Sequence, residues 1–158
     1  MTNNDVVFLM NSGIMAVSSR NLPLNSAYAV TKFKGIVEKA FKAWDEAFNK
    51  LPAEVEIKDA KAFDKRQNEL TAKVKEGNLN NAEAKELDEM NETIGRLNEL
   101  RKKLAEENVD VKVTPMPYED WMTFKETNKD IKVGNAECLE LAEIRLENVL
   151  WKAPDEAE

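Results

Sequence analysis

The chain has 158 residues, a net charge of -7, no histidine and a single cysteine, Cys138. Its length suits one domain with one core, and its acidic balance opposes general nucleic-acid binding, which needs clustered lysine and arginine. Without histidine the commonest general base and metal ligand are absent, and one cysteine excludes an intrachain disulfide. We therefore expect a protein that is not an enzyme, with no catalytic residues, metal site or cofactor.

The first apolar stretch, residues 6–17, raises the question of a targeting or membrane segment. Asn11, Ser12 and Gly13 interrupt it, and no basic residues precede it, unlike in a signal peptide. It is also too short and too polar to cross a bilayer. We expect no membrane association and a cytoplasmic location.

Apolar spacing predicts a short first helix and a long second one. Capped by Asn3, Asn4 or Asp5, the first carries apolar residues up to Val17 and ends near residues 18–20. The second runs from Asn25-Ser26 to Leu51, where a proline stops it. Its apolar face contains Val30, Phe33, Val37, Phe41, Trp44, Phe48 and Leu51.

Residues 59–107 predict a charged helical hairpin. Asp59 caps a helix that ends near Glu76, Gly77-Asn78 forms the turn, and the next helix runs from Asn80-Asn81 to about Glu107. The second helix carries an aliphatic seam, which we define as Leu87, Met90, Ile94, Leu97 and Leu104. The first helix has only a thin apolar face, so we expect Leu87, Ile94 and Leu97 to find partners outside the hairpin, at an interface.

The last third of the chain changes its pattern. Val109, Val111 and Val113 alternate with polar residues, which predicts a half-buried strand, and residues 131–133 predict a second short strand. A final helix follows Gly134-Asn135. The predicted fold is mainly α: a single helical domain over residues 1–158, with the hairpin of residues 59–107 as an arm and a small two-stranded β element near the C-terminal third.

Two segments contain candidate ligand-binding residues. Tyr118 and Trp121 lie in a predicted loop rich in proline and aromatic residues, which suits a contact surface. The alternative is that this loop folds back to cover the strands. Arg20, Tyr28 and Lys32 lie at the start of the long helix, where the helix dipole favours an anion. The alternative here is a solvated basic face.

The order of motifs resembles that of small uncharacterised tailed-phage and prophage proteins. It includes Leu22-Pro23, Ala27-Tyr28 and Lys32, then the long helix, the valine-rich strand at 109–111 and a closing helix from Leu139 to Glu147. The resemblance covers most of the chain. It implies no catalytic residues, and it implies a phage accessory role in the cytoplasm of the host cell.

Two functions follow as expectations. The first is a non-enzymatic helical interaction protein, phage- or prophage-derived, that forms homo-oligomers or binds a host or viral protein. The second is an anti-defence protein that sequesters a small anionic signalling nucleotide of the host, using Arg20, Tyr28, Lys32, Tyr118 and Trp121.

Overall fold

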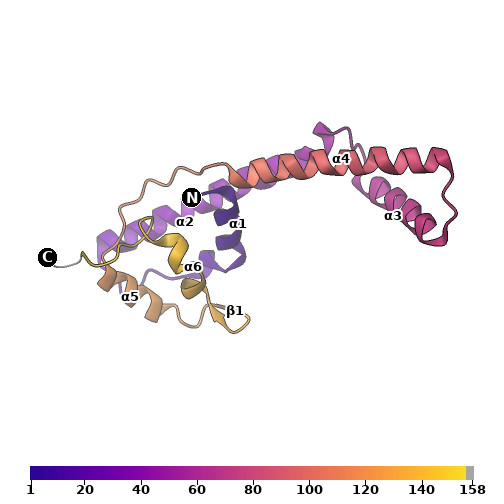
Figure 1. Cartoon of the computed structure of the whole chain (residues 1–158). Coiled ribbons are helices and arrows are strands. Elements are labelled where there is room, and N and C mark those ends of the chain that lie inside the picture. The colour runs from indigo at the N-terminus through magenta and orange to yellow at the C-terminus, as the bar shows by residue number, and fades with distance from the viewer. Residues whose placement is uncertain (156–158) are drawn as a thin grey trace. The chain divides into compact units, whose positions relative to one another are not determined.

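The computed structural model describes residues 1–155, and Figure 1 shows that this part of the chain is mainly helical. Its elements in chain order are α1 (Asn3–Asn11), the 3₁₀ helix η1 (Ile14–Ala16), α2 (Leu24–Glu54), α3 (Ala60–Glu76), α4 (Asn81–Glu106), α5 (Tyr118–Thr127), β1 (Lys132–Val133), β2 (Ala136–Glu137) and α6 (Cys138–Leu146). The expected fold class is confirmed: helices dominate, α3 and α4 form the charged hairpin, and β1 pairs with β2 in an antiparallel sheet.

The chain divides into two compact units, which we describe separately. Unit 1 contains residues 1–44 and the chain from residue 106 onward, and unit 2 contains Asp45–Ala105. Unit 2 therefore begins before the predicted arm of residues 59–107. It includes the end of α2, where Leu51 is buried, and the turn after it, where Val55 and Ile57 are buried.

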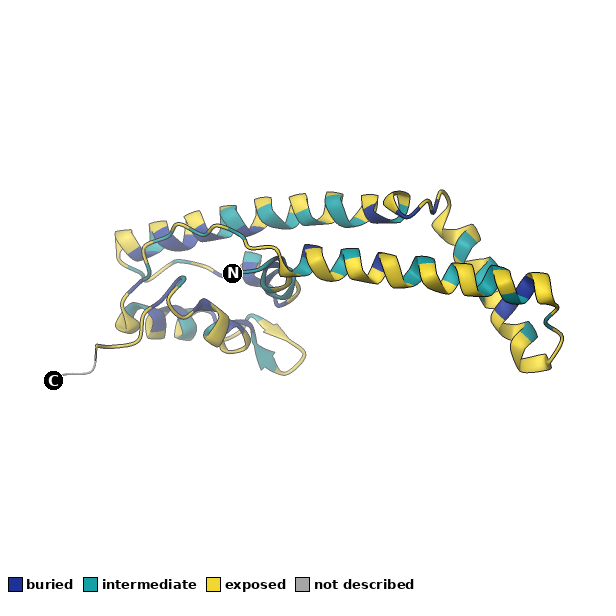
Figure 2. Ribbon diagram, turned by 45° about the horizontal axis from the view of Figure 1, so that its top comes forward, coloured by how far each residue is buried: buried dark blue, intermediate teal, exposed yellow. Residues whose placement is uncertain are grey.

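The core of unit 1 brings together α1, α2, α5 and α6. Phe33 from α2 and Trp121 and Phe124 from α5 are its largest fully buried side chains. The buried faces of these helices appear dark blue in Figure 2. The other buried apolar residues of this core are Val6, Leu9, Ile14, Val17, Ala29, Val30, Val37, Met116, Cys138, Leu139, Ala142, Leu146, Leu150 and Trp151.

The first helix is shorter than the sequence suggests. Thr2 caps it in a capping box: its hydroxyl accepts a hydrogen bond from the Asp5 N–H at 3.3 Å, and the Asp5 carboxylate accepts one from the Thr2 N–H at 2.9 Å. α1 ends at Asn11 because Gly13 adopts the left-handed φ of 89°, a conformation that breaks an α-helix. The prediction of one helix through Val17 was wrong, although Val17 itself is buried as expected.

The long helix α2 passes the proline that we expected to stop it. Pro52 lies in its last turn and the helix continues to Glu54. Proline has a helix-compatible φ, so here it removes one N–H donor just before the helix ends. Glu56 then takes a left-handed φ of 64° and turns the chain toward α3.

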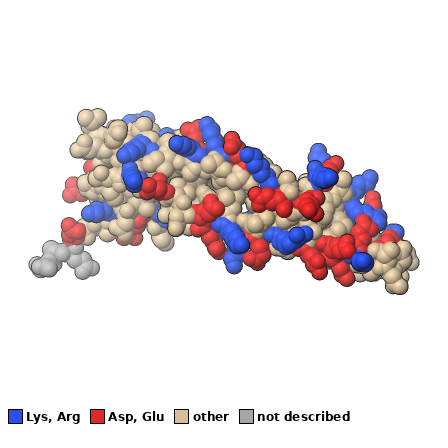
Figure 3. All heavy atoms as spheres, turned by 90° about the horizontal axis from the view of Figure 1, so that it is seen from above, with Lys and Arg blue, Asp and Glu red and all other residues tan. Residues whose placement is uncertain are grey.

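The hairpin of unit 2 follows its local signals. The Asp59 side chain accepts a hydrogen bond from the Ala62 N–H at 3.1 Å, and Gly77 ends α3 with a φ of 71°. Arg66 on α3 pairs with Glu86 on α4, and both its Nε–Oε1 and its Nη2–Oε2 distances are 2.8 Å. Figure 3 shows acidic and basic side chains interspersed over this part of the chain.

The C-terminal third departs most from the prediction. Residues 109–113 form no strand, although Val109, Val111 and Val113 do pack on the core of unit 1 while Asp110 and Lys112 face solvent. In the described residues this segment has no partner strand, and an isolated bridge joins Thr2 to Asn108 just before it. The expected β element instead joins β1 to β2 across Gly134-Asn135.

One helix near the C-terminal end also differs from the prediction. The segment expected to be a loop is α5, which begins directly after Pro117. The last helix, α6, ends at Leu146, and Asn148 follows with a left-handed φ of 63°. Leu150 and Trp151 are nevertheless buried, because the chain returns to pair Trp151 with Met116.

Candidate functional site

A cavity of about 820 Å³ in unit 1 lies beside the first turns of α2. This volume is in the range of sites that hold small organic ligands. The opposite wall is the extended segment that leads into α5. The lining residues are Pro23, Asn25, Ser26, Tyr28, Ala29, Lys32, Lys112, Val113, Thr114, Pro115, Met116, Pro117 and Asp120.

Three side chains give this cavity its chemical character. Tyr28 is 66% exposed, so much of its ring is open to solvent. Lys32 lies one turn later on the same face of α2, and Lys112 comes from the opposite wall. The first turn of α2 also contributes the positive end of its helix dipole. An aromatic ring and two lysines therefore line one cavity, and the ammonium of Lys112 also pairs with the Asp110 carboxylate at 3.4 Å.

An acidic side chain balances part of this charge. The hydroxyl of Ser26 donates a hydrogen bond to a carboxylate oxygen of Asp120 at 2.5 Å. This bond joins α2 to the first turn of α5, and Ser26 is buried. The carboxylate adds a hydrogen-bond acceptor to a wall that is otherwise apolar near Val113 and Met116. A ligand with an anionic group, a ring and hydrogen-bond donors would match these groups.

The structure brings together only part of the predicted ligand-binding set. Tyr28 and Lys32 line the cavity, whereas Arg20, Tyr118 and Trp121 are not among its lining residues. Arg20 is exposed. Tyr118 packs against Trp151, with a ring-centroid distance of 5.8 Å. Trp121 is fully buried in the core and so is closed to a ligand from solvent.

Lys112 and Asp120 are cavity residues that the sequence analysis did not select. Lys112 alternates with valines and so looks like the solvated face of a strand, and Asp120 lies in the segment expected to be a loop. Neither is near α2 in the chain, so no local pattern connects them with Tyr28.

Lys34, one turn after Val30 on α2, does not line the cavity. Its ammonium instead donates a hydrogen bond to the Val17 carbonyl at 2.8 Å.

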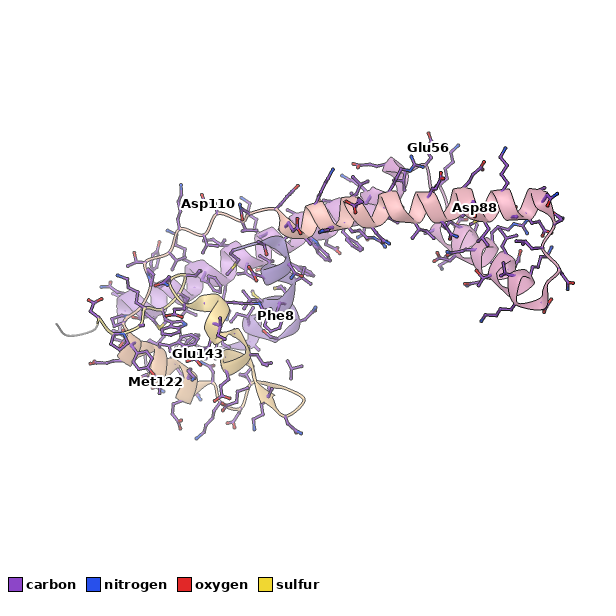
Figure 4. The ribbon with its side chains drawn as sticks, in the orientation of Figure 1. Phe8, Glu56, Asp88, Asp110, Met122 and Glu143 are labelled. Carbon is purple, nitrogen blue, oxygen red and sulfur yellow. The ribbon has the colours of Figure 1, made fainter. Side chains whose placement is uncertain are left out.

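A polar cluster around Glu143 lies between α5 and α6 (Figure 4). The Trp121 indole N–H and the Lys125 ammonium each donate to Glu143 Oε1 at 3.1 Å. These bonds, the indole first, lower the pKa of the Glu143 carboxyl below its ordinary value despite partial burial. The Trp151 indole donates to the backbone carbonyl of the same residue at 3.0 Å and stacks on Trp121. The cluster fixes two tryptophans in the core.

Cys138 is buried, as expected. Burial raises the pKa of its thiol, and the Ser12 hydroxyl lies 3.7 Å from its sulfur. A thiol with a raised pKa holds little thiolate and reacts slowly. In residues 1–155 no three His, Cys, Asp or Glu side chains are grouped so as to hold a metal ion. No helix in the same range is long and apolar enough to cross a membrane.

The seam of α4, for which we expected an outside interface, is partly buried within unit 2. Leu97 is buried, and Leu87 and Ile94 are half-buried. A small cavity of about 280 Å³ places Ile94 and Leu97 beside Pro52, Ile57 and Phe63. Two of these three, Pro52 and Ile57, lie outside residues 59–107, so the seam does find partners beyond the hairpin. They belong to the same chain.

Comparison with known proteins gave no match: no family model, no curated protein and no solved structure is similar to this chain.

Proposed function

We propose that this chain is a non-enzymatic helical interaction protein, phage- or prophage-derived, that acts by binding further copies of itself or a separate host or viral protein. In this proposal it works in the cytoplasm of the host cell. The observation that carries it is the exposure of large apolar side chains on α5 and α6, two helices that already bury an apolar face.

α6 is apolar on both of its sides. Leu139, Ala142 and Leu146 face the core, while Ile144 is 86% exposed and Leu141 is 38% exposed. Figure 4 labels Met122, which with Tyr118 occupies the outer side of α5, where both are exposed. Exposed apolar side chains that lie close together often mark protein contacts. This supports a protein partner over α5 and α6.

The test compares two equally exposed aliphatic residues. Ile144→Ser should weaken self-association or partner capture, because it removes an apolar contact from the exposed side of α6. Leu24→Ser is the matched control, since Leu24 is 85% exposed on α2. Sedimentation velocity over a range of concentrations measures self-association, and capture from host extract with each variant measures partner binding. A wild-type chain that stays monomeric and captures the same proteins as Ile144→Ser contradicts the proposal.

A second candidate function is sequestration of a small anionic nucleotide, such as a defence signal of the host. The observation that favours it is the cavity that places Tyr28 and Lys32 opposite Lys112. The Tyr28 ring would stack on a base, the two lysines would hold phosphate, and Asp120 would accept hydrogen bonds from the base or sugar.

A thermal-shift screen of nucleotides and cyclic oligonucleotides tests this candidate, because a ligand that binds only the folded state raises the Tm. Lys32→Ala should abolish any such shift. Lys39→Ala is the control: it removes an exposed lysine of the same helix that does not line the cavity. An absence of shift across the screen, or an equal effect of both variants, would count against nucleotide sequestration.

A further inference from the structure

A groove of about 900 Å³ runs along α4 in unit 2, on a different side of the helix from the seam. Its walls are the end of α2 with the turn that follows, near Glu56 in Figure 4, and the middle turns of α4. The lining residues are Glu54, Val55, Glu92, Gly95, Arg96, Glu99, Leu100 and Lys103.

The charged residues that α4 contributes to this groove alternate in sign along one face of the helix. Their order is Glu92, Arg96, Glu99 and Lys103, with steps of four, three and four residues that keep them on one side of the helix. All four are exposed. Glu92, Glu99 and Lys103 make no ion pair in the described structure, and Arg96 donates only a long bond of 3.4 Å to Thr93. The ion pairs of the hairpin use other residues.

This order of charges is complementary to itself when reversed. In two identical antiparallel helices, residues equally far from the midpoint lie opposite each other. About a midpoint between Leu97 and Asn98, Glu92 is as far away as Lys103, and Arg96 is as far away as Glu99. Each glutamate of one helix would therefore meet a basic residue of the other, and the two-fold axis would repeat every pair.

The remaining lining residues allow a helix to approach. A Cβ added to Gly95 would meet no atom within 4 Å, so the surface above this residue is open. Gly95 lies in the middle of α4, where glycine lowers helix stability by about 1 kcal/mol relative to alanine. It is also close to the midpoint between Leu97 and Asn98. Leu100 is half-buried and Val55 is buried, and together they give the groove an apolar side.

We propose that this groove binds a second copy of the chain, with the two α4 helices antiparallel and related by a two-fold axis near Leu97 and Asn98. This inference rests on the self-association version of the proposed function and gives it a surface and a partner. Glu92 pairs with Lys103 of the partner subunit, and Arg96 pairs with Glu99 of the partner subunit. Farther from the midpoint, the same register would place Glu89 opposite Glu106 of the partner subunit, and these two like charges would repel. The helices therefore cross at an angle and separate toward their ends, as in ridge-and-groove packing.

Charge reversal tests the pairing. Glu92→Lys places lysine opposite lysine twice in each dimer, and Lys103→Glu places glutamate opposite glutamate twice. Each single variant should weaken dimerisation about tenfold or more, since like charges then face each other. The double variant Glu92→Lys/Lys103→Glu carries both reversals in one chain, so opposite charges again face each other across the interface and dimerisation should recover. Lys65→Glu on α3 is the control, because it alters the net charge as Lys103→Glu does but lies outside the groove.

Mixing the two single variants gives the sharper result. A Glu92→Lys chain offers two lysines and a Lys103→Glu chain offers two glutamates, so a mixed dimer contains opposite charges at both positions. Tagged Glu92→Lys should therefore capture untagged Lys103→Glu better than either variant captures itself. Circular dichroism with urea confirms that the variants remain folded.

Two results overturn this inference. If the wild type dimerises but neither the single variants nor the mixture change its affinity, self-association uses another surface and the proposed function stands. If the wild type is monomeric at high micromolar concentration, the groove does not bind a second copy. The proposed function then depends on the separate capture experiment with Ile144→Ser.

Discussion

The two units of this chain bury very different kinds of side chain. Unit 1 encloses Phe33, Trp121 and Phe124 completely, whereas the six buried apolar residues of unit 2 are Leu51, Val55, Ile57, Leu70, Leu97 and Leu104, with no aromatic residue among them. Unit 2 adds ion pairs between its helices, from Arg66 to Glu86 and from Lys73 to Glu83. Burial of large side chains depends little on pH or salt, while ion pairs depend on pH and, to the extent that solvent reaches them, on salt.

This difference shows how a thin hydrophobic face can still form a defined hairpin. α3 offers Leu70 as its fully buried residue, with Phe63 half-buried beside it. Caps at Asp59 and Gly77 and the cross-helix pairs then fix where α3 and α4 meet. We expect unit 1 to be the more stable unit, and unit 2 to respond more strongly to acid.

The largest expected effect is in the core of unit 1. Phe33→Ala should destabilise this unit by about 3–5 kcal/mol, because it leaves a cavity at a site with no exposed surface. Urea denaturation followed by tryptophan fluorescence measures it, since Trp44, Trp121 and Trp151 all belong to unit 1. Tyr28→Ala, at an exposed position of the same helix, should change the stability by less than about 0.5 kcal/mol. Equal losses in the two variants would contradict the assigned core.

A smaller loss is expected in unit 2. Leu70→Ala should cost about 2–3 kcal/mol, the lower part of the range for leucine, because the helices around it can partly close the gap. Hydrogen exchange should show faster exchange of amides in α3 and α4. Val74→Ala, on the same helix but 51% exposed, is the matched control. If unit 1 amides lost as much protection as those of the hairpin, the two units would not respond separately.

Acid should open unit 2 before unit 1. The Lys73 ammonium lowers the pKa of Glu83, and the Arg66 guanidinium lowers the pKa of Glu86, each from an ordinary value of 4.5. A carboxyl with a lowered pKa stabilises the fold fully above its unfolded value, and this contribution is lost as the pH falls through the folded value. Below about pH 4.5, helicity by circular dichroism should therefore fall while the tryptophan emission maximum stays in the range of a folded unit 1.

The variant Glu83→Gln/Glu86→Gln supplies the control for this acid effect. It should be less stable near neutral pH, and its hairpin should show a weaker dependence on pH in the same window, because neither position can ionise. High salt should reduce the difference between the variant and the wild type. A wild-type hairpin that keeps its full helicity until the tryptophan emission changes would contradict an electrostatic contribution specific to unit 2.

The smallest effect concerns a glycine in α2. Gly35→Ala should stabilise the chain by about 0.5–1 kcal/mol, since alanine favours a helix and the added Cβ meets no atom within 4 Å. Gly77→Ala should instead destabilise unit 2, because that residue needs a φ of 71°. Thermal unfolding of both variants measures the difference. If Gly35→Ala lowered the Tm and Gly77→Ala raised it, the two backbone assignments would be wrong.

The hairpin could be predicted from sequence because its signals are local. Asp59 and Gly77 mark the ends of α3 directly, and no distant contact changes that result. α5 was missed because Pro115 and Pro117 suggested a loop, although proline is also common at the start of a helix. The alternation at residues 109–113 correctly separated inward from outward side chains. It could not reveal that the segment lacks a partner strand, since pairing depends on distant residues.

The candidate cavity was predicted only in part, because only some of its residues are close together in the sequence. Tyr28 and Lys32 lie on one helix, so their spacing alone places them together. Lys112 and Asp120 join them through long-range folding, which periodicity does not report. Trp121 was selected as a ligand contact because of its residue type, but the newly found helix α5 turns it into the core.

The buried thiol of Cys138 has a practical consequence for studying this protein. With the pKa of its one cysteine raised by burial, the native chain should remain largely unlabelled by maleimides under conditions that modify an exposed thiol within minutes. A cysteine introduced at Lys65, which is exposed and lies outside the proposed interface, would then accept a fluorophore or spin label selectively, without first replacing a core residue. Distances between labelled copies would report the geometry of any assembly directly.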